Sequence, residues 1–284
     1  MTLTLLKGRF ADGSDHVTLA PRDGKATFPL KINEAGHYWL RVTDSADTLI
    51  DNFISLTVKP AAARVLKVIE PLPTTVTAGT PITQKVAVAV EDAFGNLATQ
   101  YKGLVTLTIG AKTYSARPNH GIARFAVDNL EIRRAGSYAV TVKAPLPGHA
   151  PATVRSTLKV TPAAASTVEV ISTPKTGTAG TALGAVIALI KDEYGNVCTS
   201  DESIVSIKVK GGPGDFTPES ILTAKAVAGV VTFSNLKLNT SGDYILAVWH
   251  AHAGGISPRR HCRCRCDAVG RAAIAGLPDS GRGV

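Results

Sequence analysis

The residues best suited to chemistry stand near the end of the chain, in the run HCRCRC at positions 261–266. Cysteine thiolates and histidine imidazoles are ligands for zinc and copper, and His250 and His252 stand close enough in sequence to join them. The Cys-x-Cys-x-Cys spacing is tighter than the roughly two to four intervening residues usual in structural zinc sites. A metal site is therefore the weaker interpretation, and we expect no metal and no cofactor.

The same segment is rich in arginine, which makes phosphate contacts a second chemistry to consider. Residues 258–284 hold six Arg and no Lys, against two Asp, and so carry +4 of the formal net charge of +9. No aromatic residue is interleaved with these arginines and no nucleic-acid-binding motif surrounds them, so nucleic acid is not an expected partner. The abrupt change from lysine to arginine usage also favours a shifted reading frame or a junction in the coding sequence.

Catalytic motifs are absent from the sequence. It has no G-x-S-x-G elbow, no H-E-x-x-H pair and no dinucleotide-binding glycine pattern, and GGPGD at 211–215 lacks the Lys-Ser/Thr of a phosphate-binding loop. The histidines at 16, 37, 120 and 149 are scattered along the chain, so they do not supply a base beside a nucleophile. We therefore expect no enzymatic activity.

The elements that would position any site belong to an internal repeat. The pattern L-x-I-x-x-x-G-x-Y-x-L-x-V, with conservative changes, recurs around Gly36, Gly136 and Gly242, glycines 100 and 106 residues apart. This interval is the length of a small β-sandwich and exceeds most solenoid periods. The tyrosines two residues after these glycines resemble the tyrosine corner of immunoglobulin-like (Ig-like) sandwiches, a structural role. They are Tyr38, Tyr138 and Tyr244.

Within the repeats, apolar residues alternate with a period of two. Val86, Val88 and Val90 alternate with smaller or polar residues, a pattern that predicts half-buried strands, and no sustained helical stripe is present. Proline-rich joints such as those at 71–73 and 145–147 also disfavour helices. The expected fold is all-β, with tandem Ig-like β-sandwich modules in a row and the first and last modules incomplete.

The module boundaries follow from which repeat blocks are present. The upstream blocks, A-G-T and D-x-x-G-N, occur twice only, so residues 1–60 are expected to form a partial module lacking its early strands. Residues 64–162 form a complete module. Residues 166–257 form a module lacking its last strand, and residues 258–284 an Arg/Cys-rich irregular tail. The short Pro-Ala linkers between modules predict semi-rigid spacers.

The D-x-x-G-N block is the most distinctive motif within the modules. An Asp at a strand end accepts hydrogen bonds from backbone N–H groups ahead of it, while Gly and Asn tolerate positive φ, so a structural turn is expected. A calcium site is the alternative, with Glu91 or Glu193 beside the Asp, but six or more oxygens would be needed. The predicted turn residues are Asp92, Gly95, Asn96, Asp192, Gly195 and Asn196.

These motifs carry a family resemblance. TAGTPITQKVAVAVEDAFGN (77–96), followed by GIARFAVDNLEIRRAGSYAVTV (121–142), resembles the bacterial Ig-like repeats of large surface and secreted adhesin-type proteins. TAGTALGAVIALIKDEYGN (178–196) is similar to the same family. Filamin repeats are a weaker resemblance, around the same A-G and D-x-x-G-N turns. The resemblance implies a fold more than a function, because Ig-like sandwiches serve many roles.

The resemblance implies a non-catalytic spacer or adhesion module, a fragment of a larger repetitive protein at the cell surface or secreted. Its partners would be neighbouring Ig-like modules and a protein or carbohydrate bound through loops or sheet edges. No membrane insertion is expected, since no apolar run approaches the roughly 18 residues of a span. The start of the chain also lacks the apolar core of a secretory signal.

Two alternatives stay open: a cytoplasmic filamin-like scaffold that binds peptide strands at a sheet edge, and a truncated product without independent function.

Overall fold

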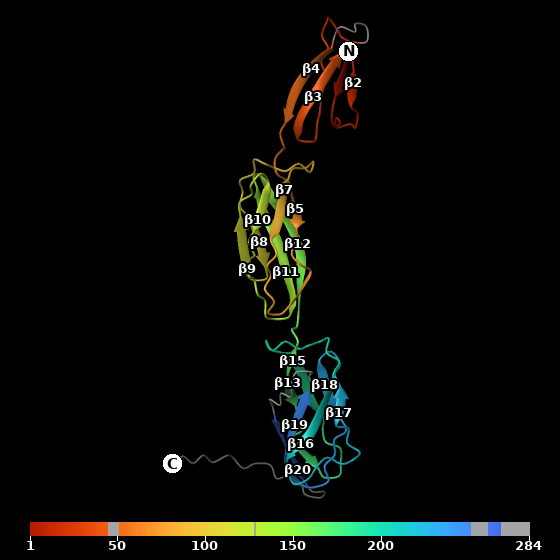
Figure 1. Cartoon of the computed structure of the whole chain (residues 1–284), viewed down its shortest axis with the longest axis vertical. Helices are drawn as coiled ribbons and strands as arrows, with labels where there is room; N and C mark the ends of the chain where they lie inside the picture. The colour runs from red at the N-terminus through yellow and green to blue at the C-terminus, as the bar shows by residue number, and fades with distance from the viewer. Residues whose placement is uncertain (45–50, 128, 251–260, 268–284) are drawn as a thin grey trace, which may run out of the picture. The chain divides into compact units, whose positions relative to one another are not determined.

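The computed structural model describes residues 1–44, 51–127 and 129–250, and the backbone of 261–267. These residues form β-strands joined by turns and loops, so the predicted all-β fold of tandem sandwich modules is confirmed (Figure 1). The chain divides into two compact units, one of residues 1–76, 81–130 and 137–159 and the other of 77–80, 131–136 and 160–284. No described segment is a helix of the length and apolar character that a membrane crossing requires.

The first module consists of one antiparallel sheet with the strand order β2-β1-β3-β4. Its strands are β1 (Thr2–Leu5), β2 (His16–Thr18), β3 (Gly36–Thr43) and β4 (Asp51–Val58). One face buries a small apolar cluster made of Leu3, Leu5, Phe10, Tyr38 and Leu40. No second sheet is present among the described residues of 1–60, and β4 is an edge strand.

The second module has two sheets, with the strand orders β10-β7-β5 and β6-β12-β11-β8-β9. Its strands are β5 (Val65–Glu70), β6 (Thr75–Thr77), β7 (Val86–Glu91), β8 (Val105–Ile109), β9 (Lys112–Ala116), β10 (Ile122–Phe125), β11 (Gly136–Leu146) and β12 (His149–Thr161). Strand β7 was expected to be half-buried, but Ala87 and Ala89 are as buried as the valines between them. The alternation in β7 therefore separates side chains by size and not by exposure.

The third module repeats this topology, with the strand orders β13-β15-β18 and β14-β20-β19-β16-β17. Its strands are β13 (Ala165–Ser172), β14 (Thr176–Thr178), β15 (Val186–Asp192), β16 (Ile204–Gly211), β17 (Thr223–Lys225), β18 (Val230–Phe233), β19 (Gly242–His250) and β20 (His261–Asp267). Its core is built around fully buried side chains such as Ile190, Phe233, Leu236 and Tyr244.

Strand β20 corrects the expectation that the third module lacks its last strand and that residues 258–284 are irregular throughout. It pairs antiparallel with β19, from Gly242 opposite Cys266 to Ala247 opposite His261, and parallel with β14. In the second module β12 occupies this place between β6 and β11. Ladder hydrogen bonds involve the backbone alone, so an unusual composition does not prevent pairing. The alternation of Cys and Arg in CRCRC has the period of two that is typical of a strand.

Candidate functional site: hydrogen-bonded joints between modules

The first D-x-x-G-N block forms a closed turn at the end of β7. Asp92 is 1% exposed, and its Oδ1 accepts hydrogen bonds from the N–H groups of Phe94 (2.8 Å) and Asn96 (2.9 Å). The backbone N–H of Asp92 donates to the carbonyl of Asn96, and Gly95 adopts a φ of 87°. This positive φ is the left-handed conformation that glycine tolerates best. The side chain of Asp92 thus holds the turn from inside.

The second oxygen of Asp92 reaches the linker that precedes the module. Oδ2 accepts hydrogen bonds from the N–H of Ala61 (2.9 Å) and from Nδ2 of Asn96 (2.8 Å). Burial by itself would raise the pKa of the Asp92 carboxyl. The hydrogen bonds from the Asn96 side chain and from the N–H groups of Ala61, Asn96 and Phe94 together outweigh burial and hold that pKa below its ordinary value of 3.8. The linker is therefore tied to an ionised carboxylate.

Asn96 extends the contact to the first module. Its Nδ2 donates to the carbonyl of Asn33 (2.7 Å), and its Oδ1 accepts from the N–H of Ala35 (2.8 Å). Both partners lie in the loop just before β3, and all of these residues belong to the first compact unit. The Lys31 ammonium lies 5.9 Å from the centroid of the Phe94 ring, a cation–π contact beside the hydrogen bonds. We call this set of contacts the first joint.

A second joint repeats the first within the other compact unit. Nδ2 of Asn196 donates to the carbonyl of Arg133 (2.7 Å), and its Oδ1 accepts from the N–H of Ala135 (2.8 Å). Oδ2 of Asp192 accepts from the N–H of the linker residue Ala163 (2.9 Å). Each Asn lies 63 residues after the carbonyl that it contacts. The pKa of Asp192 is lowered for the same reasons as that of Asp92: burial opposes the shift, and donated hydrogen bonds outweigh burial.

Aromatic residues complete the second joint. The Arg133 guanidinium lies 5.6 Å from the centroid of the Tyr194 ring. The same ring covers Gly79, because a methyl group added to Gly79 would lie 2.0 Å from the Tyr194 hydroxyl. Gly79 belongs to the A-G-T block of the second module, so both repeat blocks identified in the sequence meet at this joint.

The partners of the two asparagines were not among the predicted site residues. Asn33 and Arg133 have unrelated side chains, but each contributes only its backbone carbonyl to the Asn96 and Asn196 contacts. Motif comparison detects side-chain types, so it could not identify these groups. The signal that was available is the constant position of the contacted loop, three residues before Gly36 and Gly136.

The predicted tyrosine corners lie in strands β3, β11 and β19. The hydroxyls of Tyr38 and Tyr244 each donate to a backbone carbonyl four residues upstream, Glu34 and Thr240, at 2.8 Å. Both rings are buried. Tyr138 is half-buried, and its ring lies against Gly110. The hydrogen bonds of Tyr38 and Tyr244 fix loops to strands, which is a structural role.

The surroundings of Asp92 and Asp192 favour the structural turn over the calcium alternative. Among the described residues, no three or more His, Cys, Asp or Glu side chains gather at one point. The oxygens of Asp92 and Asp192 face N–H donors, which would repel a cation. His252 and the side chains of 261–266 lie outside the described residues.

In the described part of the third module, an Asp–Ser–His contact has an order that differs from that of a catalytic triad. The hydroxyl of Ser203 lies between Oδ1 of Asp201 and Nε2 of His250. A nucleophilic triad places the histidine between the acid and the serine, so that the histidine can accept the serine proton and the acid can stabilise the imidazolium. Here the carboxylate contacts the serine directly. The contact ties β19 to the loop before β16 and is a structural bond.

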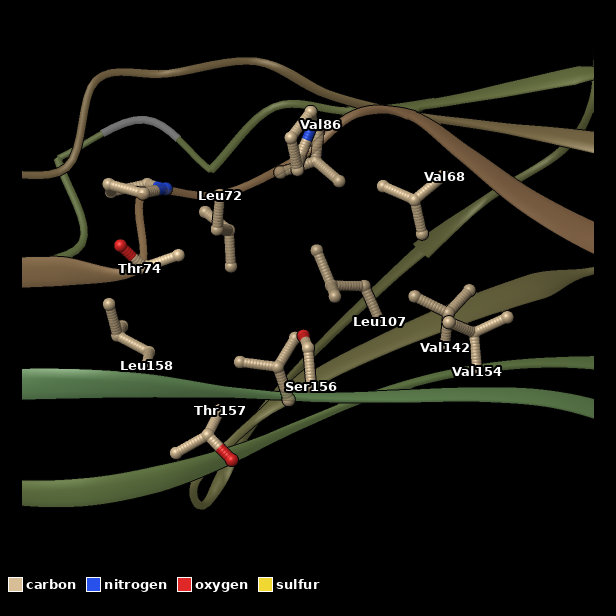
Figure 2. Close-up of a pocket in the computed structure, with 13 residues that line it drawn as sticks. Val68, Leu72, Thr74, Val86, Leu107, Val142, Val154, Ser156, Thr157 and Leu158 are labelled. Carbon is tan, nitrogen blue, oxygen red and sulfur yellow. The ribbon is translucent and has the colours of Figure 1, made fainter.

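The second module contains a small apolar cavity of about 140 Å³. Figure 2 shows Leu72, Leu107 and Leu158 lining the same space, which lies beneath the proline-rich link between β5 and β6. Its polar lining side chains are Thr74, Ser156 and Thr157, and no titratable side chain lines it. The hydroxyl groups in this lining have no acid or base beside them, and an unactivated hydroxyl is a weak nucleophile. The cavity is a packing gap between two sheets.

Comparisons with known proteins found similar solved structures but no matching sequence. No family model and no curated protein matches the sequence. Among solved structures, the Escherichia coli adhesin FdeC is 19% identical, with a TM-score of 0.37 over 84% of this chain and 75% of that one. Protocadherin gammaB7 is 14% identical, with a TM-score of 0.41 over 94% of this chain and 66% of that one. Parabacteroides merdae β-glucuronidase is 14% identical, with a TM-score of 0.25 over 74% of this chain.

The matched structures include bacterial adhesins and tandem cadherin domains. The chain spans 25% of the length of the β-glucuronidase and 46% of that of protocadherin gamma B2. At such low identities and TM-scores the likeness carries no argument about activity or ligand. The function must be inferred from the joints themselves.

Proposed function

We propose that this chain is a non-catalytic structural spacer whose Ig-like modules are held in series by fixed joints, in a cell-surface or secreted protein built from such modules. The observation that carries the proposal is the joint repeated by Asn96 and Asn196, each of which bridges a carbonyl and an N–H of the preceding module. A chance contact would not recur with the same atoms and the same sequence interval. The recurrence supports selection for a defined connection.

The chemistry of the joint suits this role. In a Pro-Ala linker the proline ring fixes one backbone φ angle, and the φ and ψ angles of the alanines are not fixed by the linker itself. Here the N–H of Ala61 and of Ala163 is bound by a buried carboxylate, so the linker is anchored within one residue of its proline. Hydrogen bonds to charged groups are stronger than neutral ones, with a net contribution of about 1.5–3 kcal/mol each. The joint therefore resists bending more than a linker of the same length would.

Adhesion is the accompanying role that we propose, through loops of the third module. The segment 210–228 exposes Ile221, Leu222 and Val227, with Val227 at 73% exposure. Exposed apolar side chains on loops carried by a rigid scaffold are suited to binding a protein or a carbohydrate. The proposed location at the cell surface or outside the cell follows from this pairing of spacer and binding loop.

Small-angle X-ray scattering of the full chain tests the spacer proposal. Asn96→Ala and Asn196→Ala each remove three hydrogen bonds, of which two connect to the preceding module, so we expect a broader distribution of radii of gyration than in the parent chain. Asn119→Ala, at an exposed position outside both joints, is the matched control and should leave the distribution unchanged. Identical scattering from the parent chain and both joint variants would refute the proposal that these joints are fixed by the asparagines.

A second candidate function, peptide binding by strand addition, is favoured by the edge strand of the first module. Residues 51–57 of β4 are all exposed, and Ile54 and Leu56 are 49% and 36% exposed although they pair with the buried Leu40 and Tyr38. Such an edge offers free ladder groups and an apolar face, as in filamin-like scaffolds. An NMR titration of the isotope-labelled chain with the peptide TTVTAGT, the β6 segment, tests peptide binding. Chemical-shift changes confined to β4 would support this function, and their absence would contradict it.

A further inference from the structure

The third module carries the counterpart of the loop that is bound at both joints. Asn239 and Ser241 stand three and one positions before Gly242, which are the positions that Asn33 and Ala35 hold in the first module. At both joints these positions supply a backbone carbonyl and a backbone N–H to one asparagine side chain. The side-chain identities differ between modules, and this does not matter to contacts that involve the backbone alone.

The loop at 239–241 is exposed. All three of its residues are exposed to solvent. Among the described residues, no hydrogen bond engages the carbonyl of Asn239 or the N–H of Ser241. Its conformation is nevertheless held, because the carbonyl of Thr240 accepts the hydrogen bond from the buried Tyr244 hydroxyl. Within the described part of the chain, this loop therefore presents one donor and one acceptor that are not engaged.

The A-G-T block of the third module also differs from its counterpart in the second module, because its glycine is not covered by an aromatic ring. Gly79 and Gly180 are equivalent and have φ values of 78° and 81°. Gly79 is covered by the Tyr194 ring of the following module, whereas a methyl group added to Gly180 would meet no atom within 4 Å. Gly180 is thus an uncovered site for an aromatic ring of the kind that Tyr194 supplies at the second joint.

We propose that Gly180 and the loop at 239–241 form an end socket that docks a further module of the same type. The partner is identified by its chemistry: an Asp-x-x-Gly-Asn turn with an aromatic residue before the glycine. Its asparagine amide would donate to the carbonyl of Asn239 and accept from the N–H of Ser241, and its ring would cover Gly180. The inference rests on the proposed function, because the two joints define what the socket accepts.

Removal of residues 1–59 tests the socket. The resulting chain, 60–284, exposes the Asn96 turn and keeps the end socket, so one copy can dock onto the next. Such a head-to-tail contact does not close on itself and gives open chains. By sedimentation velocity, we expect the weight-average mass of 60–284 to rise with concentration to at least twice that of the monomer by about 1 mM, as for a contact with a millimolar dissociation constant. The full chain, in which Asn96 is engaged, should stay monomeric.

Asn96→Ala in the 60–284 chain should restore the monomer, while Asn119→Ala should not. A monomer at every concentration, or association that persists in Asn96→Ala, overturns the socket. Circular dichroism checks that 60–284 is folded. A second experiment keeps the chain whole. The isotope-labelled full chain is titrated with residues 60–162 as the probe, and NMR chemical-shift changes are expected at Gly180 and Ser241. If association fails while the scattering test still shows stiff joints, the socket alone is refuted and the spacer function stands.

Discussion

The carboxylate of Asp92 accepts a hydrogen bond from the backbone N–H of Ala61, 31 residues earlier in the chain, at 2.9 Å. Asp192 makes the same bond to Ala163. One side chain therefore closes its own turn and fixes the linker before its module. A residue expected to shape a local turn also determines how the module is attached.

Asp92→Ala should destabilise the second module strongly. The substitution leaves four N–H donors, from Ala61, Phe94 and Asn96, without their shared acceptor in a buried site. Buried donors left unsatisfied cost about 1–3 kcal/mol each, partly recovered by water, so we expect a loss of about 2–4 kcal/mol in the free energy of unfolding. Urea denaturation measures this loss. Asp12→Ala, at an exposed aspartate with local contacts, should cost less than about 0.5 kcal/mol.

The stability of the chain should fall in acid because of the same two carboxylates. Asp92 and Asp192 have folded-state pKa values below the ordinary value of 3.8. A depressed pKa contributes stability that is fully present above the unfolded pKa and is lost as the pH falls through the folded pKa. Urea midpoints should therefore be flat from pH 7 to about 5 and decline below about pH 4. The double variant Asp92→Asn/Asp192→Asn should decline less steeply; an unchanged slope would assign the acid sensitivity to other groups.

The fold could be predicted from the sequence because period-two alternation and the repeat of about 100 residues are patterns of side-chain type, which the sequence gives directly. The joints could not, because Asn33, Arg133 and the linker alanines take part through backbone groups that every residue possesses. Strand β20 was missed because its composition is unlike that of the other strands, although its side chains alternate with the period of two that is typical of a strand. The Asp-x-x-Gly-Asn motif was identified, but the motif alone cannot show that its last residue contacts another module.

The two equivalent glycines give a matched pair of substitutions. Gly79→Ala and Gly180→Ala both place a side chain at positive φ, which costs about 1–2 kcal/mol. Gly79→Ala must in addition displace the Tyr194 ring, so we expect it to lower the thermal unfolding temperature further than Gly180→Ala does. In a Tyr194→Ala background the two substitutions should become equal. Equal effects in the parent chain would mean that the Tyr194 ring contributes nothing to the second joint.

Cys198 should be an inert thiol until the third module unfolds. Burial, with the nearby charges of Asp192 and Asp201, raises its pKa to about 11. At pH 8 only about one thiol in a thousand would be ionised, and the thiolate is the reactive form. To isolate it, Cys262, Cys264 and Cys266 are replaced by serine, and the rate of alkylation at position 198 is followed by mass spectrometry. We expect labelling at least a hundredfold slower than for a free cysteine in native buffer, and rapid labelling in urea. Fast native labelling would show that the β15 turn opens readily, in conflict with the closed Asp192 joint.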